Sequence, residues 1–111
     1  MPVSAEYREF VLEQLGRVEP VASRSMFGGV SVSSAGLPFA LISNDVVYLK
    51  VDDGNRADFE AVGMGAFYPF GDDSMKIHYY ELPAELLEDT DQLRPWIHKA
   101  LDAARRKRRK R

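Results

Sequence analysis

Two neighbouring glycines follow an arginine in the segment Ser23 to Gly29, which reads SRSMFGG. Adjacent glycines can let backbone N–H groups surround a phosphate, but such a cradle runs into the N-terminus of a helix and carries a Gly-Lys-Ser/Thr signature. Here the glycines run into Val30-Ser31-Val32, whose alternation predicts a strand. We therefore interpret Gly28 and Gly29 as a structural turn that uses the conformational freedom of glycine. Arg24 remains a candidate for gripping a carboxylate or phosphate.

The other residue types that could support catalysis or bind a metal are sparse and scattered. The chain has no cysteine and two histidines, His78 and His98, with no metal-ligand spacing around either. The pairs Asp52-Asp53 and Asp72-Asp73 stand where turns and helix caps use aspartate for local hydrogen bonds. No Gly-x-Ser-x-Gly motif marks a nucleophile. We expect no catalytic residue, no metal site and no cofactor, and we do not expect an enzyme.

Basic residues end the sequence without interruption, and they are candidate nucleic-acid contacts: Arg105, Arg106, Lys107, Arg108, Arg109, Lys110 and Arg111. They hold seven of the 15 Lys and Arg residues, which leaves eight against 17 Asp and Glu, or −9, for the rest of the chain. Such a run could bind nucleic acid or another polyanion nonspecifically, or it could serve only as a hydrated, solubilising end. It contains no aromatic residue to stack on a base. The two interpretations stay open.

Periodicity predicts the elements that would position these residues. Ser4 is a good N-cap for an amphipathic helix that ends near Gly16 and carries an apolar stripe of Tyr7, Phe10, Val11, Leu15 and Val18. Alternating strands follow, joined by turns at Ser34-Ala35-Gly36 and Asn44-Asp45. A short helix capped by Asp52 or Asp53 comes next, with Gly63 as its C′ residue.

A second hairpin is predicted from Phe67 to Glu81, with its turn at Gly71-Asp72-Asp73. In its second arm Lys76, His78 and Tyr80 share the face opposite Tyr79. With Arg24, these three residues form our candidate contact surface. A pocket near Arg24, Tyr48 and Tyr80 is the corresponding hypothesis for a small ligand.

Two helical segments are expected before the basic run. Pro83 opens a short one, and Thr90 or Asp91 starts the last helix, where Pro95 must lie in the first turn or kink the axis. Its apolar stripe comprises Leu93, Trp96, Ile97, Ala100, Leu101 and Ala104. Because no apolar residue follows Ala104, we expect one domain over residues 1–104 and a disordered basic tail over residues 105–111. No apolar run reaches the ~20 residues of a membrane span, and the N-terminus lacks a signal-peptide pattern, so we expect a cytoplasmic protein.

The order of these signals resembles that of a known family. The segments are Arg24-Ser25-Met26-Phe27-Gly28-Gly29, Phe39-Ala40-Leu41-Ile42, Val47-Tyr48-Leu49-Lys50-Val51-Asp52, Asn55, Phe59, Tyr79-Tyr80-Glu81-Leu82-Pro83, Trp96 and Ala100. This set is similar to the TfoX N-terminal domain of the TfoX/Sxy competence regulators, over about residues 5–104. The resemblance implies an α+β fold in which a curved antiparallel sheet is flanked by N-terminal, middle and C-terminal helices, akin to secretion chaperones.

The resemblance also implies a function. Full-length members of the family look like transcriptional coactivators that work with the cyclic-AMP receptor protein, without a cofactor or catalytic residues. They continue into a second, helical domain, where this sequence has its basic run. We expect a regulatory or adaptor domain that contacts a protein partner, such as the transcription machinery or a second copy of itself. The alternatives are DNA or RNA binding through the basic run and a small-ligand binder.

Overall fold

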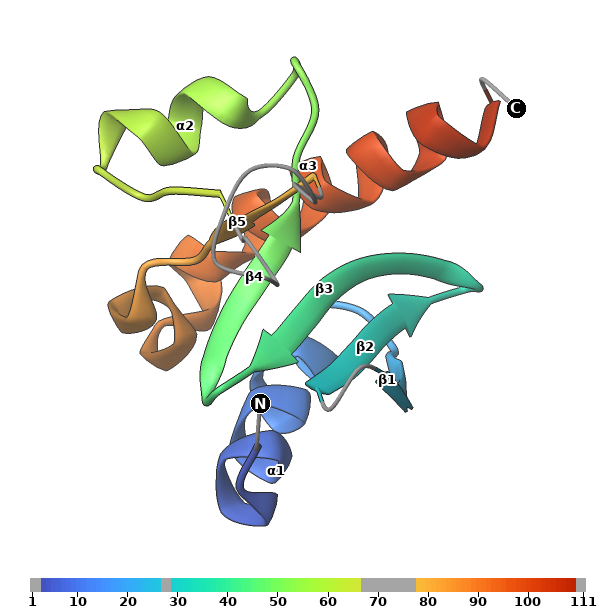
Figure 1. The fold of residues 1–111 in the computed structure, drawn as a ribbon, viewed down its shortest axis with the longest axis vertical. Coiled ribbons are helices and arrows are strands. Elements are labelled where there is room, and N and C mark those ends of the chain that lie inside the picture. The colour runs from blue at the N-terminus through green and yellow to red at the C-terminus, as the bar shows by residue number, and fades with distance from the viewer. Residues whose placement is uncertain (1–2, 27–28, 67–77, 110–111) are drawn as a thin grey trace.

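A computed structural model describes residues 3–26, 29–66 and 78–109 of the chain. In chain order its elements are α1 (Ala5–Gly16), β1 (Ala22–Met26), β2 (Gly29–Ser34), β3 (Leu37–Ser43), β4 (Val46–Lys50), α2 (Arg56–Ala61), β5 (Tyr79–Glu81), the 3₁₀ helix η2 (Ala84–Glu88) and α3 (Thr90–Arg109). The strands form one antiparallel sheet in the order β1-β2-β3-β4-β5, with α1, α2 and α3 outside it (Figure 1). The predicted α+β architecture is confirmed.

Helix α1 begins where the sequence predicts, because the Ser4 hydroxyl accepts a hydrogen bond from the Tyr7 N–H at 3.2 Å. Val11 and Leu15, one turn apart, are fully buried in the core. The sequence predicts Phe10 on the same apolar stripe, but its side chain is 38% exposed. The reason is geometric: neighbouring helical residues point about 100° apart, so the face that buries Val11 turns Phe10 toward solvent.

Two tight turns fold strands β2, β3 and β4 into a meander. Ala35 and Gly36 join β2 to β3 with φ of 52° and 80°, and Asn44 and Asp45 join β3 to β4 with φ of 53° and 57°. Two consecutive residues with positive φ make the hairpin turn whose twist matches that of the strands. Both turns lie where the sequence predicts them. Asp45 also accepts a hydrogen bond from the Ser4 N–H at 2.9 Å, which ties the start of α1 to the second turn.

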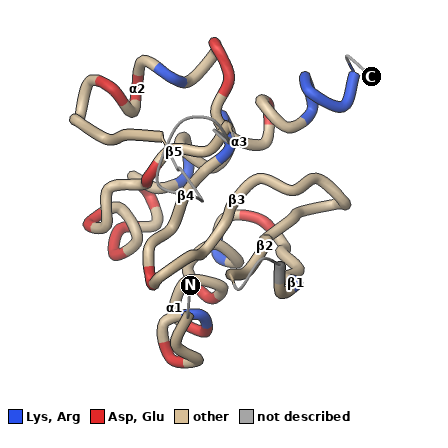
Figure 2. The backbone as a smooth tube through the Cα atoms, in the orientation of Figure 1, with Lys and Arg blue, Asp and Glu red and all other residues tan. Residues whose placement is uncertain are grey.

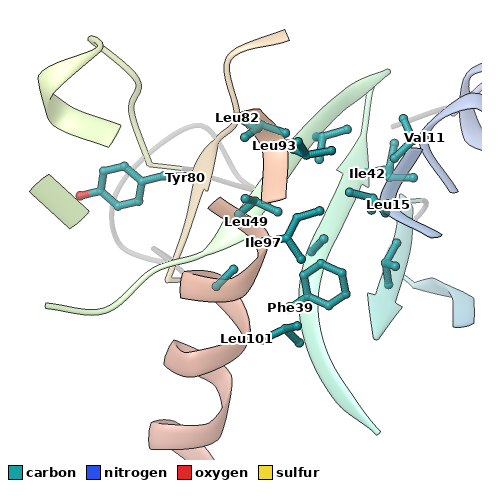
Figure 3. Close-up of a cluster of buried hydrophobic side chains, with 14 of the residues drawn as sticks. Val11, Leu15, Phe39, Ile42, Leu49, Tyr80, Leu82, Leu93, Ile97 and Leu101 are labelled. Carbon is teal, nitrogen blue, oxygen red and sulfur yellow. The ribbon is translucent and has the colours of Figure 1, made fainter. Parts of the chain in front are cut away.

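A β-bulge in β3 turns its largest side chain toward the core. The register between β2 and β3 shifts after Val32, which pairs with Ala40, so that Ser33 pairs with Pro38 and Phe39 is the extra residue. Phe39 is fully buried, and it lies beside Ile97 and Leu101 of α3 (Figure 3). Ala40 is the first residue of β3 that pairs with β4, and Pro38 lies before it. The missing N–H of Pro38 therefore removes no hydrogen bond between β3 and β4.

Helix α2 ends as predicted but begins differently. Gly63 has φ +78°, its N–H bonds the Glu60 carbonyl, and the Met64 N–H bonds the Phe59 carbonyl, which is the Schellman pattern with glycine at C′. The N-cap residue is Asn55, not Asp52 or Asp53. The Asp52 carboxylate instead accepts a hydrogen bond from the Gly54 N–H in the preceding turn, and both aspartates form ion pairs with arginines.

The second hairpin is described only in part. Its first arm, its turn and the first three residues of its second arm fall on residues 67–77, which lie outside the described ranges. β5 pairs antiparallel with β4. Tyr79 and Tyr80 point to opposite faces of the sheet, yet both are buried, with exposures of 8% and 7%. The Tyr80 ring packs against Phe59, with centroids 5.9 Å apart. The structure therefore does not place Tyr80 on an exposed contact face, because α2 covers it.

Helix α3 crosses the sheet and supplies much of the core. The predicted stripe is confirmed: its members Leu93, Ile97, Ala100, Leu101 and Ala104 are buried, and Trp96 is half-buried. Asp89 caps the helix by accepting a hydrogen bond from the Gln92 N–H, so Pro95 lies beyond the first turn. The helix does not end at Ala104 but continues to Arg109. Side-chain contacts hold this basic end to the body of the protein, although it buries no large apolar group.

Candidate functional site

A cleft of about 320 Å³ opens between the basic end of α3 and the segment that joins β4 to α2. Figure 2 shows the basic residues gathered along the end of α3. The described residues that line the cleft are Lys50, Val51, Asp52, Asp53, Arg56, His78, Ala103, Arg106 and Lys107. Four of the nine are Lys or Arg and two are Asp, so the cleft is basic within a chain whose net charge is −2. We refer to it as the basic cleft.

Arg106 and Asp52 hold one wall of the basic cleft together. The Arg106 Nε donates to Asp52 Oδ2 at 2.6 Å, and its Nη2 donates to Asp52 Oδ1 at 2.8 Å. This forked geometry is the strong form of an arginine–carboxylate pair. A Cβ at Gly54 would lie only 2.5 Å from Arg106 Nη2. The close approach of the guanidinium to the backbone therefore requires glycine at that position or displacement of the arginine.

Asn55 fixes the loop that presents these carboxylates. Its side chain is 2% exposed, accepts a hydrogen bond from the Asp52 N–H at 2.9 Å and donates one to the Lys50 carbonyl at 2.9 Å. Asp53, one residue on from Asp52, pairs with Arg56 at 2.6 Å. Both carboxylates of the cleft are thus engaged with an arginine, and the loop that carries them is pinned by a buried amide.

Lys50 stands apart from these ion pairs. Burial, followed by the charge of nearby Lys107, lowers the pKa of Lys50 to about 8. Its Nζ lies 5.1 Å from the centroid of the Tyr79 ring, a cation–π contact. Burial in turn raises the pKa of the Tyr79 hydroxyl to about 12. Within the described parts of the chain, neither Lys50 nor Lys107 forms an ion pair with a carboxylate.

The structure brings together only some of the residues singled out from the sequence. His78, Arg106 and Lys107 line the basic cleft, and Arg108 donates to the Gly36 carbonyl nearby at 2.9 Å. Arg105 pairs with Asp102, and Arg109 is exposed at the end of the helix. Gly29 begins β2, so the chain continues from it as a strand and not as a helix. Gly28, Lys76, Lys110 and Arg111 lie outside the described residues.

Arg24 lies elsewhere, exposed on β1 at the far edge of the sheet from β5. Tyr48 and Tyr80 occupy neighbouring strands but opposite faces, since Tyr48 pairs with Glu81 and Leu49 pairs with Tyr80. None of these three residues lines the basic cleft or the second opening beside it. The hypothesis of one pocket near Arg24, Tyr48 and Tyr80 therefore gains no support.

Sequence reasoning missed Lys50, Asp52 and Arg56 as parts of a site. Lys50 looked like an ordinary polar residue on an alternating strand, and Asp52 like a turn residue. The informative signal was the segment VDDGN, a turn with two carboxylates and a glycine, in a chain that also carries a dense run of arginines. Nothing in the sequence, however, shows that α3 returns to this turn.

Two kinds of feature are absent from the described residues. No three side chains among their His, Asp and Glu residues gather as a metal site would require. None of the helices in the described part of the chain combines the length and apolar composition of a membrane span.

Comparison with known proteins identifies the family to which this arrangement belongs. The family model for the TfoX N-terminal domain matches residues 13–104, from the middle of α1 to the last buried alanine of α3. No curated protein matches the chain. The matched residues contain the whole described sheet and the lining of the basic cleft except Arg106 and Lys107. Because the match covers most of the 111 residues, the chain belongs to the TfoX N-terminal domain family.

Proposed function

We propose that this chain is a cytoplasmic regulatory or adaptor domain that acts by contact with a protein partner and catalyses no reaction. The observation that carries the proposal is the family match, since the family implies a transcriptional coactivator. A domain of that type needs a surface on which a partner can dock, and the fold offers one at the edge of its sheet.

Strand β1 is the outermost strand on its side, and β2 is the only described strand that pairs with it. An edge strand presents backbone N–H and C=O groups that can pair with an added strand. Arg24 and Ser25 are exposed along it, and Ser23 accepts a hydrogen bond from Arg8 of α1. A partner strand with a carboxylate opposite Arg24 fits this edge, because cross-strand pairs of opposite charge stabilise a sheet.

Affinity capture from the native lysate, with nuclease treatment, tests the proposal. We expect a protein that is retained by the wild-type chain and lost with Arg24→Glu, which would face the partner's carboxylate with a like charge. Arg94→Glu makes the same charge change on α3 and should retain the partner. Equal retention by both variants, or retention only before nuclease treatment, contradicts the proposal. Light scattering of the purified chain shows whether the partner is a second copy.

One observation favours a second candidate function, the binding of DNA or RNA. The basic run is helical up to Arg109, so exposed Arg105, Lys107 and Arg109 project from an ordered element. The double variant Arg105→Glu/Arg109→Glu changes no residue of either cleft and should abolish oligonucleotide binding at low salt. Arg17→Glu/Arg94→Glu has the same net charge and should leave binding intact. If the wild-type chain binds no oligonucleotide, this second function is wrong.

A further inference from the structure

Lys50 and Lys107 lie between two neighbouring clefts of the protein. The basic cleft adjoins a second cleft of about 330 Å³, whose lining comprises Gly36, Leu37, Pro38, Lys50, Ala104, Lys107 and Arg108. Lys50 and Lys107 line both. Lys50 comes from the end of β4 and Lys107 from the last turns of α3. The pair therefore stands at the junction of two accessible spaces, in contact with both.

The charges around this junction do not cancel. Asp52 engages Arg106, and Asp53 engages Arg56, so the two carboxylates of the basic cleft are matched by the two arginines. Lys50 and Lys107 remain without a carboxylate among the described residues, and Arg108 bonds only a neutral carbonyl. The described residues of the junction thus carry an excess of two to three positive charges, which matches a dianion better than a monoanion.

The fold holds these two ammonium groups near each other at a cost. Like charges in a half-buried site repel more strongly than they would in water, and desolvation adds to the penalty. An anion between them would replace that repulsion by two charge-assisted contacts. The last carbonyls of α3 carry the negative end of the helix dipole and moderate the repulsion only in part.

We propose that Lys50 and Lys107 bind the phosphate of a small phosphate monoester whose remainder lies in the basic cleft. The volume of that cleft is near the lower limit for small-molecule sites, about 300 Å³. Val51 and Ala103 give it an apolar portion, and His78 lines it with a planar ring. This ligand site is independent of the partner surface at β1, so either proposal can fail without the other.

Isothermal titration at pH 7, where Lys50 is protonated because its pKa is about 8, tests this proposal. The probes are inorganic phosphate, adenosine 5′-monophosphate and adenosine. We expect the first two to bind and adenosine, which lacks the phosphate, not to bind. Lys50→Met and Lys107→Met should each weaken binding of the monophosphate at least tenfold. Lys99→Met, on the same helix but paired with Asp58 outside both clefts, should change it less than twofold.

Three results would overturn the proposal: no binding of either phosphate probe by the wild-type chain, equal weakening by Lys99→Met, or binding that survives both cleft variants. A single-stranded oligonucleotide that binds through Lys50 and Lys107 when both small probes fail would also overturn it, in favour of a nucleic-acid backbone. Because Lys107 is exposed, Lys107→Met keeps the test valid if Lys50→Met lowers the melting temperature.

Discussion

Lys50 shows how one side chain can occupy two environments. Its side chain is half-buried, its ammonium nitrogen lies 5.1 Å from the centroid of the Tyr79 ring, and it also lines the basic cleft. The charged and titratable groups that line the same clefts or contact Lys50 come from several elements. They are Lys107, Arg106 and Arg108 of α3, Asp52 and Asp53 of the loop, Arg56 of α2, and His78 and Tyr79 at β5. Burial and then the charge of Lys107 lower the pKa of Lys50, so its ammonium group is easier to deprotonate than that of an exposed lysine.

Stability should therefore rise with pH above the pKa of Lys50. Between about 8 in the folded chain and 10.5 in the unfolded chain, the unfolded state holds the proton that the folded state has released. The difference in unfolding free energy between the wild-type chain and Lys50→Met should increase in favour of the wild type from pH 8 to pH 10. Urea unfolding measures it, with Lys99→Met as control for the loss of one lysine.

Tyrosines limit the pH range over which stability rises. Burial raises the pKa values of Tyr7, Tyr48 and Tyr79, so the folded state holds their protons longer and loses stability above pH 10. Comparison with Lys50→Met removes this shared decline. A difference between the two proteins that stays constant from pH 7 to pH 10 would contradict the lowered pKa of Lys50.

At the scale of elements, α3 combines three functions along one helix. Its first turns are capped by Asp89, its middle packs its apolar stripe against β3 and β4, and its last turns deliver Arg106 and Lys107 to the basic cleft. Pro95 interrupts the hydrogen-bond ladder in the exposed part of the helix, where it has no N–H to donate to the Asp91 carbonyl.

Pro95→Ala should stabilise the protein. Proline in a helix interior is about 3 kcal/mol less favourable than alanine, and because the helix forms despite it, we expect a gain of about 1–3 kcal/mol in the free energy of unfolding. Chemical denaturation measures the change. Pro20→Ala, in the loop after α1, is the matched control and should lower stability by about 0.4–1 kcal/mol through the unfolded chain. Equal effects at both prolines would contradict the assigned role of Pro95.

At the scale of the whole molecule, α2 joins the core through a single buried ring, and the ion pair between Asp58 and Lys99 of α3 adds a contact at the surface. Phe59 is the only buried residue of this helix, with 1% exposure. It packs against Tyr80 of β5 and edge-on against Trp96 of α3, with centroids 4.8 Å apart in the second contact. This aromatic cluster therefore supplies the buried contact that positions α2 beside the basic cleft, while Asn55 and the Arg106–Asp52 pair hold the preceding turn.

Phe59→Ala should destabilise the molecule by about 3–5 kcal/mol, because it removes a buried aromatic side chain and leaves a cavity. Guanidinium unfolding measures the loss, and hydrogen exchange of the α2 amides should rise with it. Phe10→Ala truncates an aromatic ring that is 38% exposed, so we expect less than about 1 kcal/mol. A small effect at Phe59 would show that α2 is held by other contacts.

The sequence predicted those features of the fold that depend on residues close together in the chain. Ser4, Asn44-Asp45 and Gly63 act within a few residues of themselves, and each is found in its predicted role. Phe10 and Tyr80 were assigned to the wrong environments, since burial depends on which partner covers a face. The basic run was expected to be disordered because it buries nothing large, yet Arg106 reaches Asp52, 54 positions away in the chain.

The sequence by itself determined the antiparallel meander, its turns, the helices at either end and the family, because these follow from periodicity, turn chemistry and the order of short segments. Only the tertiary structure decided that the end of α3 lies against the turn after β4 and that Lys50 and Lys107 share a junction. Such neighbours are set by the packing of a helix across a sheet, and no spacing along the chain encodes the distance between them.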